Sequence, residues 1–235
     1  MATIASTSHV IDTWFTTLSL EQKEAITTVL TTTLDPLFFQ STKTVQPVMI
    51  VVADRKQCVF VRKSFVQNEL QFYPFIVTED EVQQLSTLHP IEFFIFRSFS
   101  SLFYGENILN SVVLLRDSHY EETLRELQQL IFHVRSTAIT ITPKSIRPFL
   151  EKVTARLYPL LLSLLSLDSA PITVQWGQVV AAVESRCSIK SFILSQIITF
   201  LEGNAKEFSL SLDSTIDALE ESLYEIFETL KRQQG

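Results

Sequence analysis

The sequence predicts an α+β protein, in which a small, mostly antiparallel sheet with flanking helices is followed by a C-terminal helical bundle. Between about residues 48 and 115, short apolar runs rich in Val, Ile and Phe alternate with polar residues, which is typical of strands. After residue 116, apolar residues recur every three or four positions, as in helices. This change of pattern predicts two domains, residues 1–116 and 117–235.

A helix is expected before the sheet. Ser19 and Gln22 have the spacing of a capping box, in which each side chain accepts a hydrogen bond from the other residue's backbone. Apolar residues then follow at helical spacing, which predicts a helix that ends near Asp35 and Pro36. These apolar residues are Ile26, Val29, Leu30 and Leu34.

The predicted sheet starts with a hairpin. Val48–Ala53 and Cys58–Phe65 flank four polar residues, a length that suits the connection of two antiparallel strands. Glu69–Val77 is expected to add a third strand, at an edge because Pro74 lacks a backbone N–H. Ile91–Arg97 and Ser111–Leu115 are expected to complete the sheet.

A short helix is expected inside this region, over Thr78–Leu88, with Thr78 as its N-cap. The next helix should start near Asp117 and Ser118, where Glu121 occupies the third position of a capping box. Its apolar face is predicted from the recurrence of Tyr120, Leu124, Leu127, Ile131 and Val134.

The remaining helices are predicted from the same signals. Thr142 and Pro143 are expected to open a long helix that Pro159 kinks or divides. Val174–Ser185 and Ile189–Glu202 are expected to form two more helices, the second capped by Gly203. In the last helix a heptad stripe can pack either within the chain or against a partner. That stripe consists of Leu212, Ile216, Leu219, Leu223, Ile226 and Leu230.

No motif for catalysis, a cofactor or a metal is visible. The chain has four isolated glycines, and none belongs to a GxGxxG or GxxxxGK[ST] phosphate-binding loop. The four histidines form no HExxH arrangement, and Cys58 and Cys187 form no CxxC pair. We therefore expect no catalytic residues, no cofactor and no metal, and interpret the chain as a binding or assembly module that is not an enzyme.

Net charge, hydropathy and cysteine content indicate which partners and which cellular location to expect. A net charge of −7 opposes binding to nucleic acid or to anionic membranes, which normally needs a basic surface. The most apolar run, Leu157–Leu167, is about half the length that crosses a bilayer. Residues 1–20 lack the basic start of a signal peptide, and the two cysteines form no disulfide framework. A cytoplasmic, reducing location is expected, with no membrane insertion.

Part of the sequence resembles a known family. The segments VMIVVADRKQCVFVRKSF and IEFFIFRS, followed by Glu106-Asn107-Ile108, are similar to the N-terminal tail region of axonemal dynein heavy chains. The similarity extends from Pro47 to Trp176. It departs from that family at Arg116-Asp117, where a glycine is common. Without a phosphate-binding loop the chain is not expected to be a motor.

The resemblance implies a non-catalytic assembly subunit that mediates dimerisation or docking within an axonemal dynein complex of a cilium or flagellum. Its implied partners are dynein heavy-chain tails or other axonemal subunits in a hetero-oligomer, at the cytoskeleton. The alternatives are a cytosolic α+β adaptor that binds peptides or trafficking proteins and an enzyme with an unrecognised site. The candidate protein-binding residues are Val48, Ile50, Val52, Val59, Val61, Phe94, Phe96, Leu212, Ile216, Leu219, Leu223, Ile226 and Leu230.

Overall fold

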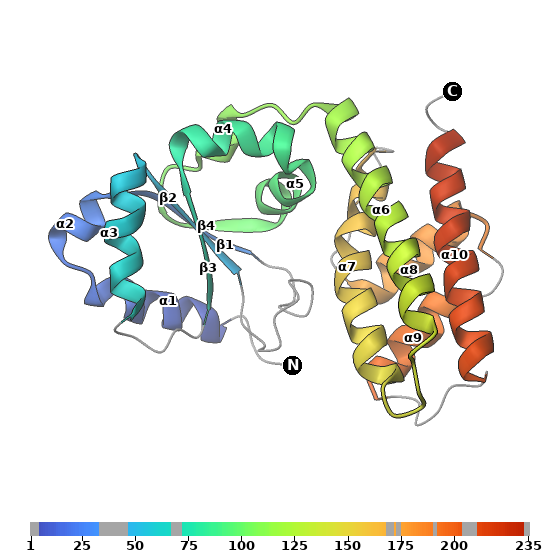
Figure 1. Cartoon of the computed structure of the whole chain (residues 1–235). Coiled ribbons are helices and arrows are strands. Elements are labelled where there is room, and N and C mark those ends of the chain that lie inside the picture. The colour runs from blue at the N-terminus through green and yellow to red at the C-terminus, as the bar shows by residue number, and fades with distance from the viewer. Residues whose placement is uncertain are drawn as a thin grey trace. The chain divides into compact units, whose positions relative to one another are not determined.

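The computed structural model divides the chain into two compact units, Met1–Ser118 and His119–Gly235. Within them the structure describes residues 5–32, 47–66, 72–167, 172, 175–189, 192–203 and 211–232. The first unit contains a four-stranded sheet with flanking helices, and the second is helical in its described part (Figure 1). The predicted α+β class, with a helical C-terminal region, is therefore confirmed.

The sheet has the strand order β3-β2-β1-β4. The strands are β1 (Ile26–Thr32), β2 (Pro47–Val52), β3 (Tyr73–Thr78) and β4 (Ser100–Gly105). β1 is antiparallel to both β2 and β4, whereas β2 and β3 are parallel. All six residues of β2 are buried, so this strand needs an apolar layer on each face of the sheet.

Helices supply those two layers. On one face, α1 (Ala5–Thr17) and α3 (Arg55–Val66) pack against Val48, Ile50 and Val52. On the other face, α4 (Glu79–Leu88) and α5 (Pro90–Phe99) pack against Met49 and Val51. Alternate residues of β2 thus enter two separate cores, as the two-residue period of a strand requires. Figure 1 shows the two helix pairs on opposite sides of the sheet.

The predicted N-terminal helix is mostly wrong. Its capping box forms, because the Gln22 amide donates to Ser19 Oγ at 3.2 Å and the Ser19 amide donates to Gln22 Oε1 at 3.0 Å. However, the helix α2 ends at Glu24, and residues 26–32 form β1. The stretch ITTVLTT is rich in β-branched residues, which favour strands over helices. Leu34 and the predicted end at Asp35 and Pro36 lie outside the described residues.

The predicted hairpin is half right. Val48–Ala53 corresponds to β2, but Cys58–Phe65 belongs to helix α3. Asp54 Oδ1 caps this helix by accepting from the amides of Lys56 and Gln57 at 2.7 and 3.0 Å. The helix then serves as the crossover that two parallel strands such as β2 and β3 require.

The next two predicted elements are present. β3 lies at the edge of the sheet and contains Pro74, as expected, although residues 69–71 of the predicted strand lie outside the described part. Thr78 caps α4, accepting from the Glu81 amide at 3.2 Å while its own amide donates to Glu81 Oε2 at 2.8 Å.

The last two predicted strands are wrong. Ile91–Arg97 is part of α5, which Pro90 opens at its first turn and whose apolar residues are buried on nearly all sides. Ser111–Leu115 contains the end of a short 3-10 helix, Ile108–Ser111, and no strand. The fourth strand is instead β4, where only partial burial weakens the pattern that would have predicted it.

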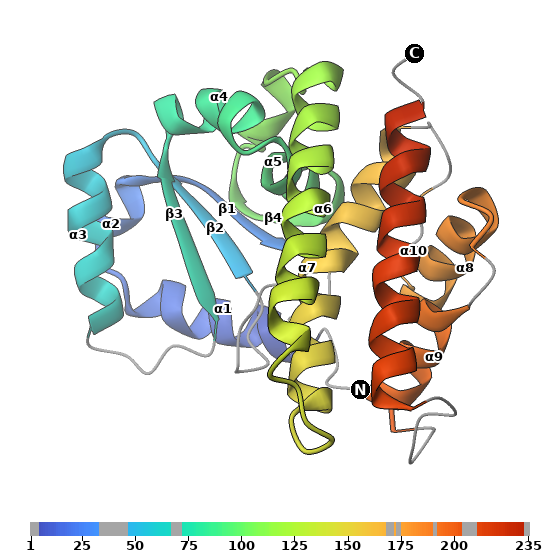
Figure 2. The same cartoon turned by 45° about the vertical axis from the view of Figure 1, so that its right-hand side comes forward.

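The predicted helices of the second unit are present, but the one expected to open at Thr142 and Pro143 starts at Ile146, and the one expected over Ile189–Glu202 spans Ile193–Leu201. They are α6 (Arg116–Ala138), α7 (Ile146–Leu167), α8 (Trp176–Arg186), α9 (Ile193–Leu201) and α10 (Leu212–Arg232), seen from a second side in Figure 2. Val174, the predicted start of α8, lies outside the described residues. Gly203 has the positive φ of +77° expected for a residue that ends α9.

The core of this unit is mainly aliphatic, although Tyr158 is completely buried in it. Pro159 lies inside α7 without dividing it. The heptad stripe of α10 packs within the chain, since Leu219, Leu223 and Leu230 are completely buried. The Tyr120 hydroxyl links α6 to α10 by donating to the Leu230 carbonyl at 3.0 Å. Among the helices that the structure describes, none has the length and apolar content to cross a membrane.

Gly105 ends β4 in a conformation that other residues rarely adopt. Its φ is +78°, and a Cβ atom added there would lie 1.8 Å from the carbonyl oxygen of Thr27. Gly177 in α8 provides a matched comparison, because no atom lies within 4 Å of a Cβ added there.

We expect Gly105→Ala to lower the free energy of unfolding of the first unit by about 2 kcal/mol or more, because the backbone of β1 must move away. Gly177→Ala should leave stability unchanged or raise it by up to about 1 kcal/mol. Urea unfolding followed by Trp14 fluorescence in a Trp176→Phe background measures the first effect. Equal stabilities of the Gly105→Ala and parent proteins would contradict the predicted close approach.

Candidate functional site

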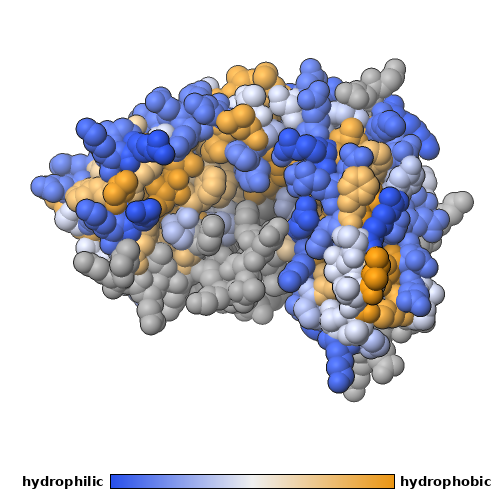
Figure 3. Space-filling view, in the orientation of Figure 1, coloured by the Kyte–Doolittle hydropathy of each residue, from blue (hydrophilic) through white to orange (hydrophobic). Residues whose placement is uncertain are grey.

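A groove on the helical unit is lined by α6 and α10. It has a volume of about 490 Å³, and its lining residues are Arg135, Asp217, Glu220, Glu221, Tyr224 and Glu225. Figure 3 shows hydrophilic and hydrophobic residues side by side on the visible face of this unit. The groove therefore combines charged groups with an aromatic ring on a single surface.

One ion pair crosses the groove. Arg135 Nε donates to Glu220 Oε1 at 2.5 Å, which joins α6 to α10. The other carboxylates of the lining, on Asp217, Glu221 and Glu225, exceed the single guanidinium in number and make the groove negative. Because Tyr224 is 49% exposed, its ring is accessible to a cation as well. This arrangement is suited to binding a positively charged group.

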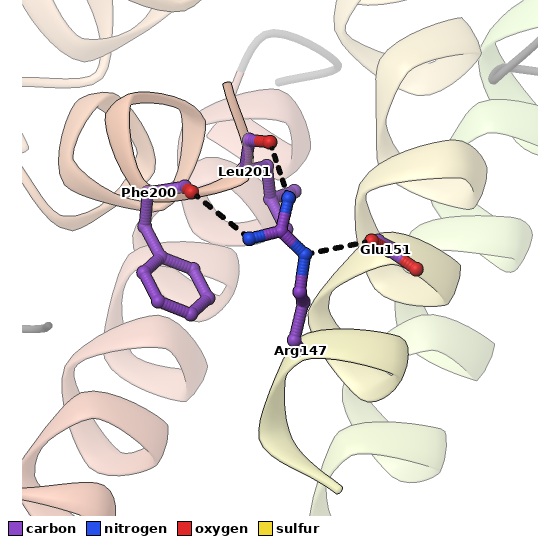
Figure 4. Close-up of polar contacts among 4 residues, drawn as sticks. All are labelled: Arg147, Glu151, Phe200 and Leu201. Carbon is purple, nitrogen blue, oxygen red and sulfur yellow. Dashed lines mark hydrogen bonds and ion pairs between the residues drawn. The ribbon is translucent and has the colours of Figure 1, made fainter. Parts of the chain in front are cut away.

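Arg147 holds the end of α9 against α7. Its guanidinium donates to the carbonyl of Leu201 at 2.7 Å and to that of Phe200 at 3.5 Å, while Nε donates to Glu151 at 3.2 Å (Figure 4). The guanidinium carbon also lies 5.4 Å from the centre of the Phe200 ring. A cation at the last carbonyls of a helix satisfies groups that have no partner within that helix.

Two buried hydroxyls without partners belong to residues that are paired across the sheet. Thr32 of β1 and Ser100 of β4 are paired in register, and neither hydroxyl oxygen has a hydrogen-bond partner. Since buried polar groups are normally satisfied, this pair marks a position that one water molecule or one polar ligand atom would satisfy. Thr32 itself is 2% exposed.

Neither cysteine has the environment of an activated nucleophile. Burial raises the pKa of Cys58, with Glu81 and Asp54 adding to the effect, and burial also raises the pKa of Cys187. Both cysteines therefore favour the protonated thiol, which is a poor nucleophile. In the part of the chain that the structure describes, no three residues of the types His, Cys, Asp and Glu are grouped to hold a metal ion.

Most of the predicted protein-binding residues lie in the cores. Val59 is 47% exposed, and Leu212 is partly exposed. The assignment of Val59 and Leu212 to an interface stays a prediction. The buried ones are Val48, Ile50, Val52, Val61, Phe94, Phe96, Ile216, Leu219, Leu223, Ile226 and Leu230.

Sequence reasoning missed both the groove and the hydroxyl pair. The acidic residues of α10 are visible in the sequence at helical spacing, but Arg135 lies 85 positions from its partner Glu220. Thr32 and Ser100 are also far apart in the sequence and are joined only by the pairing of β1 with β4. No local pattern connects either pair.

We predict that Arg147→Ala loosens the C-terminal end of α9, because the carbonyls of Phe200 and Leu201 lose their charged donor. The expected loss of stability is about 1 kcal/mol, since the guanidinium is half exposed. Hydrogen exchange of residues 193–203 should become several-fold faster. Arg125→Ala, which removes an ion pair within α6 between an exposed arginine and the largely buried Glu122, is the control and should leave this exchange unchanged.

Burial lowers the pKa of His119 to about 4. In the unfolded chain this histidine binds a proton near pH 6.5, so protons favour unfolding between these two values. We expect the second unit to keep its full stability above pH 6.5 and to lose on the order of 3 kcal/mol as the pH falls to 4.

Urea unfolding followed by Trp176 fluorescence in a Trp14→Phe background tests this pH dependence. His119→Gln should flatten the curve between pH 4 and 6.5, whereas His133→Gln, on the same helix, should not. An unchanged slope in His119→Gln would assign the acid sensitivity to other groups.

Comparison with known proteins assigns the fold. No family model matches the chain, and no curated protein matches it in sequence. Among solved structures, the spectinomycin adenyltransferase AAD(9) from Enterococcus faecialis, crystallised with ATP and spectinomycin, is similar with a TM-score of 0.53 and 13% sequence identity. The match covers 93% of this chain and 99% of that chain.

This likeness contradicts the dynein-tail resemblance. The segments that carried the resemblance were interpreted as a hairpin and a strand, but Cys58–Phe65 and Ile91–Arg97 are helical. The predicted non-catalytic subunit of an axonemal dynein complex is therefore wrong, and the adaptor alternative gains no support. What this chain shares with AAD(9) is the fold.

Proposed function

We propose that the chain is a nucleotidyltransferase-type enzyme, which transfers a nucleotidyl group from a nucleoside triphosphate to a small, positively charged acceptor. The observation that carries this proposal is the extent of the likeness to AAD(9), at 93% of this chain and 99% of that chain. A match of that extent involves the helical unit as well as the sheet. The sheet unit and the helical unit of this chain would thus both correspond to parts of an enzyme that binds two substrates.

The reaction has simple requirements. An oxygen or nitrogen of the acceptor attacks the α-phosphorus of the triphosphate, the bond to pyrophosphate breaks, and the acceptor loses a proton to a base. The protein must hold the acceptor beside the triphosphate and keep the attacking atom in line with the leaving group, because positioning supplies much of the rate in phosphoryl chemistry.

The acidic groove supports the proposal that the acceptor is positively charged. Its carboxylates on Asp217, Glu221 and Glu225 complement an ammonium group, and Tyr224 offers a ring face at the same place. Spectinomycin is the compound with which AAD(9) was crystallised, together with ATP. It is therefore a suitable first probe of the acceptor site.

Two measurements on the full chain test the proposal. ATP with magnesium should raise the melting temperature, because a ligand that binds the folded state stabilises it. Pyrophosphate release from ATP labelled at the α-phosphate should depend on adding spectinomycin or another amine-bearing molecule. We expect the label to appear on that acceptor. If ATP neither stabilises the protein nor releases pyrophosphate with any acceptor, the proposal is wrong.

Groove variants separate acceptor binding from nucleotide binding. Asp217→Asn combined with Glu221→Gln should raise KM for a cationic acceptor about tenfold while leaving kcat nearly unchanged, because it removes ground-state attraction. The stabilisation by ATP should persist. Glu228→Gln, on the same helix but outside the groove lining, is the matched control and should leave KM unchanged.

A further inference from the structure

Helix α3 presents a basic face. Four of its twelve residues are Arg or Lys and none is acidic. Arg55, Lys56, Arg62 and Lys63 are all exposed, and Val59 between them is 47% exposed. Within the described residues none of these four cations forms an ion pair. The opposite side of the helix packs into the core through Val61, Cys58 and Phe65.

Helix α10 presents an acidic face. Asp213, Asp217 and Glu221 are exposed, and Glu225 and Glu228 are partly exposed. Among these five carboxylates, none has an ion-pair partner in the described parts of the chain. The stripe that begins at Leu212 occupies the other side of α10, so the acidic face remains open.

The two faces match in spacing when the helices run antiparallel. Arg55, Val59 and Arg62 are separated by four and then three residues, and Glu228, Tyr224 and Glu221 are separated by four and then three residues in the reverse direction. On each helix the two charges are seven residues apart, or about 10.5 Å along the axis. Each charge therefore meets its opposite, with Val59 against Tyr224 at the centre.

We propose that α3 of one copy of this chain docks antiparallel on α10 of a second copy, through the pairs Arg55 with Glu228 and Arg62 with Glu221. A second copy supplies a carboxylate row with the helical repeat that α3 fits. A nucleic acid backbone has a different repeat, and its charge opposes the net charge of −7. Because exposed ion pairs are weak, the complex is transient and salt-dependent. The contact does not require the transfer reaction, but it covers Glu221 and Tyr224 of the groove, so a docked copy and a cationic acceptor exclude each other.

Sedimentation velocity of the full chain over a range of concentrations tests the contact. We expect weak self-association at 50 mM salt that is lost at 500 mM, since screening removes most of the attraction between exposed charges. The variants Arg55→Glu with Arg62→Glu, and Glu221→Lys with Glu228→Lys, should each raise the dissociation constant at least about tenfold by creating like-charge pairs.

Mixing the α3 variant with the α10 variant tests whether these two helices contact each other. In the mixture the reversed α3 of one protein faces the reversed α10 of the other, so association should return to the parent level. Lys144→Glu with Lys152→Glu changes the net charge equally at exposed lysines elsewhere and should leave self-association unchanged. A parent chain that stays monomeric at every concentration, a mixture that fails to associate, or an α3-dependent affinity for nucleic acid would overturn the proposal.

Discussion

The burial of β2 on both faces determines the architecture of the first unit. PVMIVV has no polar side chain, and each of its residues is buried. A strand of this kind is stable only between two apolar layers, and Val48, Ile50 and Val52 enter one core while Met49 and Val51 enter the other. The parallel neighbour β3 must then be reached through a crossover, which α3 provides. The positions of α3, α4 and α5 all follow from this requirement.

Helical periodicity after residue 116 and several signals with a specific stereochemical cause predicted structure correctly. The cap signals at Ser118 and at Thr142 did not mark helix starts, since these helices begin at Arg116 and Ile146. The capping pairs at Ser19 and Thr78, and the αL residue Gly203, are all present in the structure. Short apolar runs were less informative, because β-branched and aromatic residues occur in buried helices as well as in strands. The run in α5 is one case, where Pro90 at the helix start was the better signal. Asp54 and Gln57 likewise have capping-box spacing, which favours a helix after β2.

The candidate site could not be predicted, because its parts come together only through tertiary structure. Arg135 reaches Glu220 when α6 and α10 pack side by side, and Thr32 lies opposite Ser100 only once β1 has paired with β4. At 13% identity the likeness to AAD(9) is also carried by the fold and not by residues that can be recognised in the sequence. Absence of a glycine-rich loop therefore excluded particular motifs and did not exclude an enzyme.

The prediction of a strand at Cys58–Phe65, where a helix forms, also gave the wrong distribution of surface charge. In a strand, Arg62 and Lys63 would point to opposite faces, and Arg55 would belong to a turn, so the positive charges would be dispersed. In the helix that forms, residues 55, 59 and 62 lie on one side, because positions three and four apart are neighbours. The same four cations thereby become one continuous basic face. The helix that packs against β2 on one side thus exposes on its other side a row of positive charges whose spacing matches that of the acidic face of α10.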